Sequence, residues 1–157
     1  EEGALCVYGS QSTSFVGRTR VALGMADIPD LLTAVAALRE ARAARGEGRL
    51  EAAAAAADKA LGVLPSDEPE TRVVALTERG RIAREADDLA RADVWLREAV
   101  ALSKEEMADG TLRRAAINEL ALTVQARGRP EEARDLLEGA LKASPVRKDG
   151  VLPLVLN

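Results

Sequence analysis

The feature that most restricts the fold is a pair of helix-forming segments joined by a short turn, in residues 114–145. In both segments apolar residues recur at the three-and-four spacing of one helix face. They are Ile117, Leu120, Ala121 and Val124 in the first segment, and Ala133, Leu136, Leu137, Ala140 and Leu141 in the second. Between them, Gly128 can adopt the left-handed conformation that ends a helix, and Pro130 suits the first turn of the next. The pattern predicts two helices with a tight turn between them.

The same arrangement occurs twice more, earlier in the chain. Each second segment has a small residue at the same point of its apolar face, at Ala53, Ala92 and Ala133, which lie 39 and 41 residues apart. A proline followed by an acidic residue marks a helix start near Pro29 and again near Pro69. We therefore expect six antiparallel helices in three stacked pairs between about residues 28 and 145, with little or no strand.

The segment from 114 to 145 resembles a tetratricopeptide repeat (TPR). The matching positions are Ile117, Leu120, Ala121, Val124, Gly128, Ala133, Leu137, Ala140 and Pro145. The resemblance implies an all-α fold, in which TPR-like pairs over residues 27–145 form an α-solenoid with a right-handed superhelix. It implies about three repeats and the start of a fourth. The repeats exceed the standard length of about 34 residues, as is common in bacterial regulatory arrays, and Glu40 and Arg79 replace expected apolar residues.

The two ends of the chain differ from the predicted array. Residues 1–26 are rich in Gly, Ser and Thr and show no helical period. We interpret them either as a disordered tail or as a cap in which Val7, Tyr8, Phe15 and Val16 cover the first helix pair. Residues 146–157 are predicted to be the truncated start of a further helix. Their apolar run from Val151 could pack on the third repeat, meet a partner or pair with a second copy.

Composition excludes several classes of function. The chain has no His, one Cys and no Gly-rich phosphate loop, so we expect neither an enzyme nor a metal or cofactor site. A net charge of −4 argues against nucleic-acid binding. No run approaches the roughly 18 apolar residues that span a bilayer. The single cysteine suits a reducing compartment, so a cytoplasmic location is expected. Trp95 is interpreted as covering the seam between two repeats rather than binding a ligand.

The TPR resemblance also implies which side chains line a concave groove. They are Arg39, Arg42 and Arg45 in the first repeat, Thr77, Arg81 and Arg84 in the second, and Asn118, Leu122 and Gln125 in the third. Five arginines gathered in an otherwise acidic protein favour an extended peptide with acidic residues or a free C-terminus. The alternative is a solvated charged face with pairs such as Arg81 to Glu85, four residues apart on one helix.

Two classes of function fit these observations. In the first, the array is a protein-interaction scaffold or adaptor that binds a peptide or a partner domain in its groove. In the second, it is the sensor or regulatory segment of a larger bacterial signalling protein, such as a transcription regulator, an ATPase or a protease.

Overall fold

The computed structural model describes residues 28–65, 67–106 and 110–143, and within them the chain is entirely helical, with no strand. The helices are α2 (Ile28–Gly46), α3 (Leu50–Val63), α4 (Pro69–Glu85), α5 (Leu89–Glu106), α6 (Gly110–Ala126) and α7 (Pro130–Ala143). The prediction of an all-α fold with six helices between residues 28 and 145 is thus confirmed. The expectations for residues 1–26 and 146–157 lie outside the described residues. None of the six helices is long and apolar enough to cross a membrane.

The turn inside each helix pair has the same backbone geometry. Gly48, Asp87 and Gly128 all have positive φ angles, of 76°, 61° and 77°. In each case the amide of the next residue donates to the carbonyl five residues back in the preceding helix, as from Arg129 to Val124 at 3.1 Å. This bond satisfies a carbonyl left free at the helix end. Asp87 is the only residue other than glycine with a positive φ in the described part of the chain.

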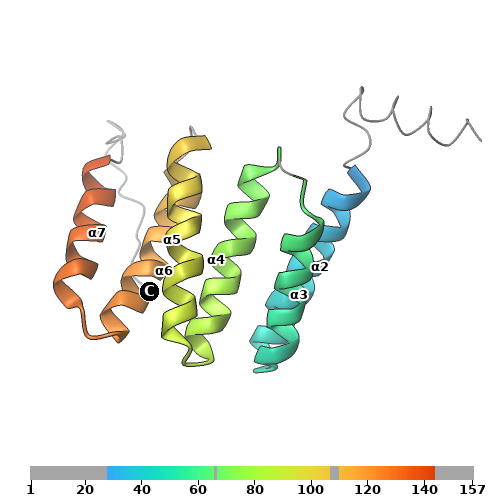
Figure 1. Cartoon of the computed structure of the whole chain (residues 1–157), viewed down its shortest axis with the longest axis horizontal. Helices are drawn as coiled ribbons and strands as arrows, with labels where there is room; N and C mark the ends of the chain where they lie inside the picture. The colour runs from blue at the N-terminus through green and yellow to red at the C-terminus, as the bar shows by residue number, and fades with distance from the viewer. Residues whose placement is uncertain (1–27, 66, 107–109, 144–157) are drawn as a thin grey trace, which may run out of the picture.

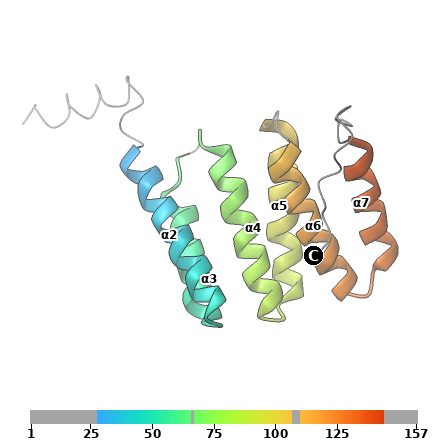
Figure 2. The ribbon, with the colours of Figure 1, turned by 180° about the vertical axis from the view of Figure 1, so that it is seen from behind.

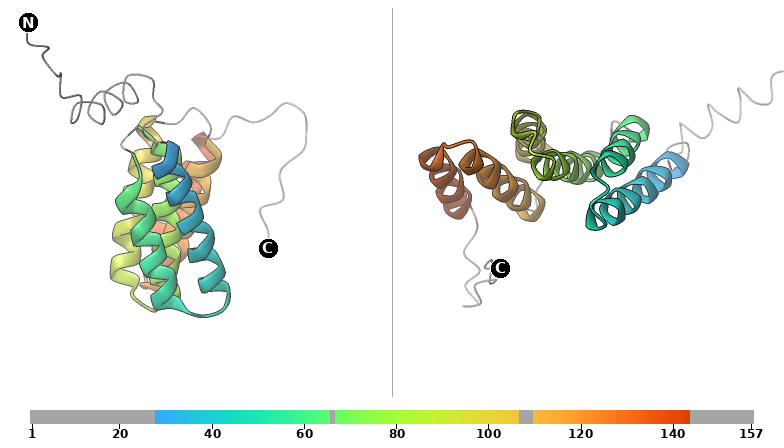
Figure 3. Two further views of the ribbon diagram at one scale, coloured as in Figure 1. Left: turned by 90° about the vertical axis from the view of Figure 1, so that its right-hand side faces the viewer. Right: turned by 90° about the horizontal axis from the view of Figure 1, so that it is seen from below.

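The helices pack only against near neighbours along the chain. Every helix contacts the next one, and α4 also contacts both α2 and α6. The pairs therefore lie side by side in a row, with α3 and α5 towards the viewer in Figure 1 and α2 and α6 towards the viewer in Figure 2. The view from below in Figure 3 shows α2, α4 and α6 following one another, with α3 and α5 on the other side. We call the surface of α2, α4 and α6 that faces away from α3 and α5 the wall.

Small residues lie where neighbouring helices pack against each other. Ala53 and Ala92 are fully buried and Ala133 is 5% exposed, each inside an apolar cluster that joins its own helix to the preceding one. These three alanines, which share one point of the apolar face of each second helix, thus lie buried between two helices. Gly80 of α4 is equally buried, against Leu96 of α5. The core is accordingly built of Ala, Leu, Ile and Val rather than of aromatic residues.

Trp95 lies where three helices meet. It packs against a cluster formed by Val73 and Leu76 of α4, Ala99 of α5 and Ala116 of α6. The interpretation that it covers the seam between one pair and the next is therefore confirmed. Arg79, which stands where the sequence pattern expects leucine, lies 5.8 Å from the centre of the Trp95 ring.

Candidate functional site

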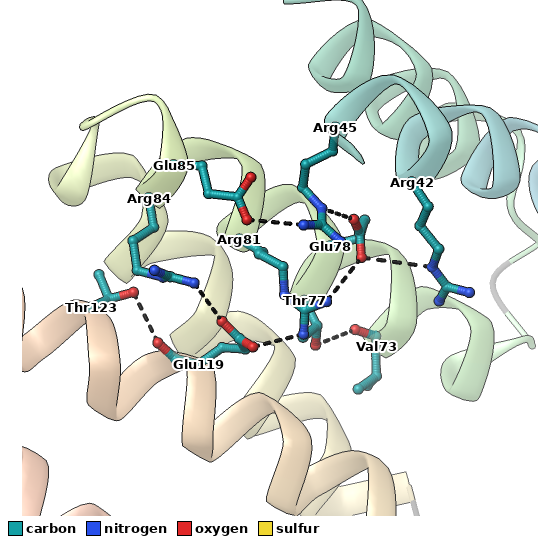
Figure 4. A network of polar contacts seen from close by, with 10 residues as sticks. All are labelled: Arg42, Arg45, Val73, Thr77, Glu78, Arg81, Arg84, Glu85, Glu119 and Thr123. Atoms are coloured by element: carbon teal, nitrogen blue, oxygen red, sulfur yellow. Dashed lines mark hydrogen bonds and ion pairs between the residues drawn. The ribbon is translucent and has the colours of Figure 1, made fainter. Parts of the chain in front are cut away.

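The predicted groove residues lie on α2, α4 and α6, the three helices of the wall, but most of the arginines have partners within the chain. Glu78 of α4 is only 3% exposed, and Glu119 of α6 only 8%. Figure 4 shows these two carboxylates between arginines from neighbouring helices. We call this set the Arg/Glu network. It consists of Arg42, Arg45, Glu78, Arg81, Arg84, Glu85 and Glu119.

Glu78 joins α2 to α4. Arg45 Nε donates to Glu78 Oε1 at 2.7 Å, and Arg42 Nε lies 3.7 Å from Glu78 Oε2. Arg45 also donates through Nη1 to Glu85 Oε1 at 3.0 Å. The hydrogen bond to Glu78 raises the pKa of the Arg45 guanidinium above its ordinary value, in spite of the partial burial that would lower it. Arg45 is therefore a permanently charged link between two helices.

Glu119 joins α4 to α6 in the same way. Arg81 Nη2 donates to Glu119 Oε1 at 2.7 Å, and Arg84 Nη2 donates to Glu119 Oε2 at 3.1 Å. Arg81 Nη1 also lies 3.6 Å from Glu78 Oε2, so this arginine connects the two carboxylates. Because a buried carboxylate is costly unless it is paired, these contacts offset the cost of burying Glu119 between the two helices.

The network repeats with the helix pairs. Arg42 and Arg45 occupy the same positions of α2 that Arg81 and Arg84 occupy in α4, 39 residues later. Glu78 and Glu119, which they bind, are 41 residues apart, the spacing of Ala92 and Ala133. An Arg-x-x-Arg on one wall helix thus binds a glutamate on the next. This repeated spacing is the signal in the sequence that could have identified the two structural glutamates.

The pairing of Arg81 with Glu85, the example given for the alternative of a solvated charged face, is not formed. Arg81 lies instead against Glu119 and Glu78. Glu85 instead accepts from Arg45 on α2. The arginines reach across to the neighbouring helices because a poorly solvated carboxylate offers a stronger partner than an exposed one. The two alternatives from the sequence were an unpaired groove and ion pairs within one helix. The structure instead pairs Arg45, Arg81 and Arg84 with glutamates on neighbouring helices.

The remaining predicted groove residues differ in how accessible they are. Thr77 is half-buried, and its hydroxyl donates to the backbone carbonyl of Val73 at 2.7 Å. Asn118, Leu122 and Gln125 of α6 are exposed. They occupy the end of the wall away from α2, and no hydrogen bond or ion pair joins their side chains to the described residues. These three side chains carry no charge.

A cleft of about 360 Å³ opens on the wall. Its lining comes from α2, α4 and α6, and we call it the α2/α4 cleft. The lining residues are Val35, Leu38, Arg39, Arg42, Glu70, Thr71, Val74 and Leu112. Arg39 is exposed and makes no hydrogen bond or ion pair with the described residues. Glu70, on the α4 side of the cleft, is also exposed and makes no hydrogen bond or ion pair with the described residues. Two of the predicted groove residues, Arg39 and Arg42, thus meet here.

A metal site is not formed by the described part of the chain, where no three acidic or cysteine side chains gather closely enough to hold an ion. Comparison of the chain with protein-family models, curated proteins and solved structures found no match.

Proposed function

We propose that this chain is a protein-interaction scaffold, built as an α-solenoid of three TPR-like helix pairs. Three observations support the proposal: the same turn in every pair, the same small residue at every crossing, and two layers in which α4 contacts α2 and α6. Stacking of this kind would wind the pairs into a right-handed superhelix with the wall on its inner side. The fold would then present a binding surface rather than enclose an active site.

The observation that carries the proposal is the exposure of the wall. The second layer packs on the opposite side of α2, α4 and α6, so side chains along the wall remain open. Arg39, Arg42, Asn118, Leu122 and Gln125 are all exposed, and Leu122 is a large apolar residue at 43% exposure. A surface with charged, amide and apolar groups in a row can bind an extended peptide along its length.

Peptides selected from a displayed random library against the immobilised chain test this proposal. The selected peptides are then titrated against Leu122→Arg on the wall and Val94→Arg on α5, whose side chain is 62% exposed in the other layer. We expect Leu122→Arg to weaken binding at least about tenfold, or about 1.4 kcal/mol, and Val94→Arg to leave it unchanged. No enrichment of peptides, or equal losses in both variants, would contradict a binding wall.

The same wall could serve as the sensor or autoinhibitory segment of a larger bacterial signalling protein. The Arg/Glu network supports this alternative, because one continuous set of ion pairs joins α2, α4 and α6. A ligand that displaced Arg42 from Glu78 would alter contacts in the next pair. Cloning and sequencing the gene region around this chain would decide, since a regulatory segment requires an effector domain on the same polypeptide.

A further inference from the structure

The five arginines of the wall fall into two groups. Arg45, Arg81 and Arg84 each donate to a carboxylate on another helix at 3.1 Å or less. Arg42 is 53% exposed and has only one contact, at 3.7 Å, and Arg39 has none among the described residues. The charges of the first group are already matched by carboxylates of the chain itself, so a ligand carboxylate would compete with Glu78 or Glu119 for them. It could bind Arg39 and Arg42 directly.

Arg39 and Arg42 stand beside apolar surface. Both line the α2/α4 cleft together with Val35 and Leu38 of their own helix and Val74 of α4. Being three residues apart on α2, they present their guanidinium groups on the same face. The cleft, at about 360 Å³, falls within the range of small ligand-binding clefts, roughly 300–1,000 Å³. It can therefore receive an apolar side chain while the flanking arginines hold an adjacent anion.

We propose that the α2/α4 cleft binds a peptide segment that has acidic residues on one side of a large apolar residue. The apolar side chain enters between Val35, Leu38 and Val74, and the carboxylates bind Arg39 and Arg42. The inference rests on the proposed scaffold function and specifies the chemistry of its ligand.

Glu70 fixes the direction of the bound segment. It is an exposed carboxylate on α4 that lines the same cleft as the two arginines of α2 and has no partner among the described residues. An acidic residue on the Glu70 side would be repelled, whereas a basic residue or an amino terminus would be favoured. The sign of the charge therefore differs across the cleft, and a peptide with acidic residues on one side of its apolar residue fits in one orientation.

The attraction has to be local, because the whole chain carries a net charge of −4. An acidic peptide gains no general attraction from such a protein. Its affinity must come from the two arginines at close range and from burial of the apolar side chain. Binding should accordingly weaken with added salt and also require the apolar residue.

The test uses three labelled peptides of equal length in fluorescence-anisotropy titrations: leucine followed by glutamates, serine followed by glutamates, and leucine followed by lysines. We expect only the first to bind well. Arg39→Gln/Arg42→Gln should weaken its binding about tenfold or more. The matched control is Arg91→Gln/Arg134→Gln, which makes the same change in net charge at exposed sites on α5 and α7. This control should bind as the native chain does.

A charge exchange completes the test. Arg39→Glu/Arg42→Glu should prefer the leucine–lysine peptide, and circular dichroism checks that both double variants remain folded.

Equal binding of the acidic peptides with leucine and with serine would overturn the inference, as would affinities unchanged in Arg39→Gln/Arg42→Gln. If peptides from the library still lose affinity in Leu122→Arg, the scaffold proposal survives such a result. If they do not, both proposals fail.

Discussion

Leu96 of α5 occupies the space beside Gly80 of α4 so closely that a β-carbon on Gly80 would lie 2.5 Å from the Leu96 Cγ. The corresponding positions of α2 and α6 hold Ala41 and Ala121. The central pair thus combines the smallest residue on one helix with a fully buried leucine on the other. The two helices can approach this closely only because Gly80 has no side chain.

Gly80→Ala should therefore destabilise the protein, by about 1–3 kcal/mol, because the added methyl overpacks the contact with Leu96. The higher helix propensity of alanine, worth up to about 1 kcal/mol, offsets only part of this cost. Urea unfolding measures the difference. Gly139→Ala is the control, since a β-carbon there meets no atom within 4 Å, and it should stabilise. A gain in stability for both variants would show that the α4–α5 contact can relax.

Asp87→Gly should stabilise the protein. Asp87 has the positive φ of 61° that Gly48 and Gly128 adopt in the other two turns, a conformation that is costly for a residue with a side chain. We expect a gain of about 0.5–1 kcal/mol, seen as a higher melting temperature in thermal unfolding. The reciprocal exchange, Gly128→Asp, should lower the melting temperature. Changes of the same sign in both variants would be inconsistent with equivalent turns.

Arg81 and Glu119 should be strongly coupled in a double-mutant cycle. Removing either partner leaves a charge with little solvation, so we expect Glu119→Ala to cost about 2–4 kcal/mol and the cycle to give a coupling energy above about 1 kcal/mol. The exposed pair Arg134–Glu131 is the control, because both of its side chains are more than half exposed. Coupling there should lie within measurement error. Similar values for both pairs would mean that the Arg/Glu network does not hold α4 and α6 together.

Arg79→Ala should change the fluorescence of Trp95, the only tryptophan of the chain. Arg79 contacts the Trp95 ring and also donates to both carboxylate oxygens of Asp58, at 2.6 and 3.3 Å. Its loss exposes the ring to water, which should shift the emission maximum to longer wavelength. Arg134→Ala, at an exposed site on α7, should leave the spectrum unchanged. An unshifted spectrum in Arg79→Ala would show that the guanidinium does not shield the ring.

Helix positions could be predicted from the sequence because local signals set them. Gly128 and Pro130 mark a turn by their own backbone preferences, and alanines such as Ala92 mark a crossing by size alone. The partners of Arg45 and Arg81 could not be predicted in this way. Each lies on another helix more than 30 residues away, at 33 positions for Arg45 and 38 for Arg81. Such pairs depend on how the helices are stacked, which no short stretch of sequence encodes.

The sequence also could not predict which arginines of the groove are open to a ligand. Arg39 and Arg84 are the same residue type on wall helices, yet Arg84 binds Glu119 and Arg39 has no partner among the described residues. The resemblance to a TPR implied which arginines line the wall. Only the position of the buried carboxylates separates those that hold the helices together from those open to a ligand.

The restriction of contacts to near neighbours along the chain also determines how the protein comes apart. No described helix contacts another that is more than two places away in the sequence of helices. Among the described residues, the central helices α4 and α5 have partner helices on both sides, whereas α2 and α7 contact other helices on one side only. Backbone amides should therefore exchange with deuterium slowest in α4 and α5 and progressively faster towards α2 and α7, because an outer helix can open while the centre stays folded.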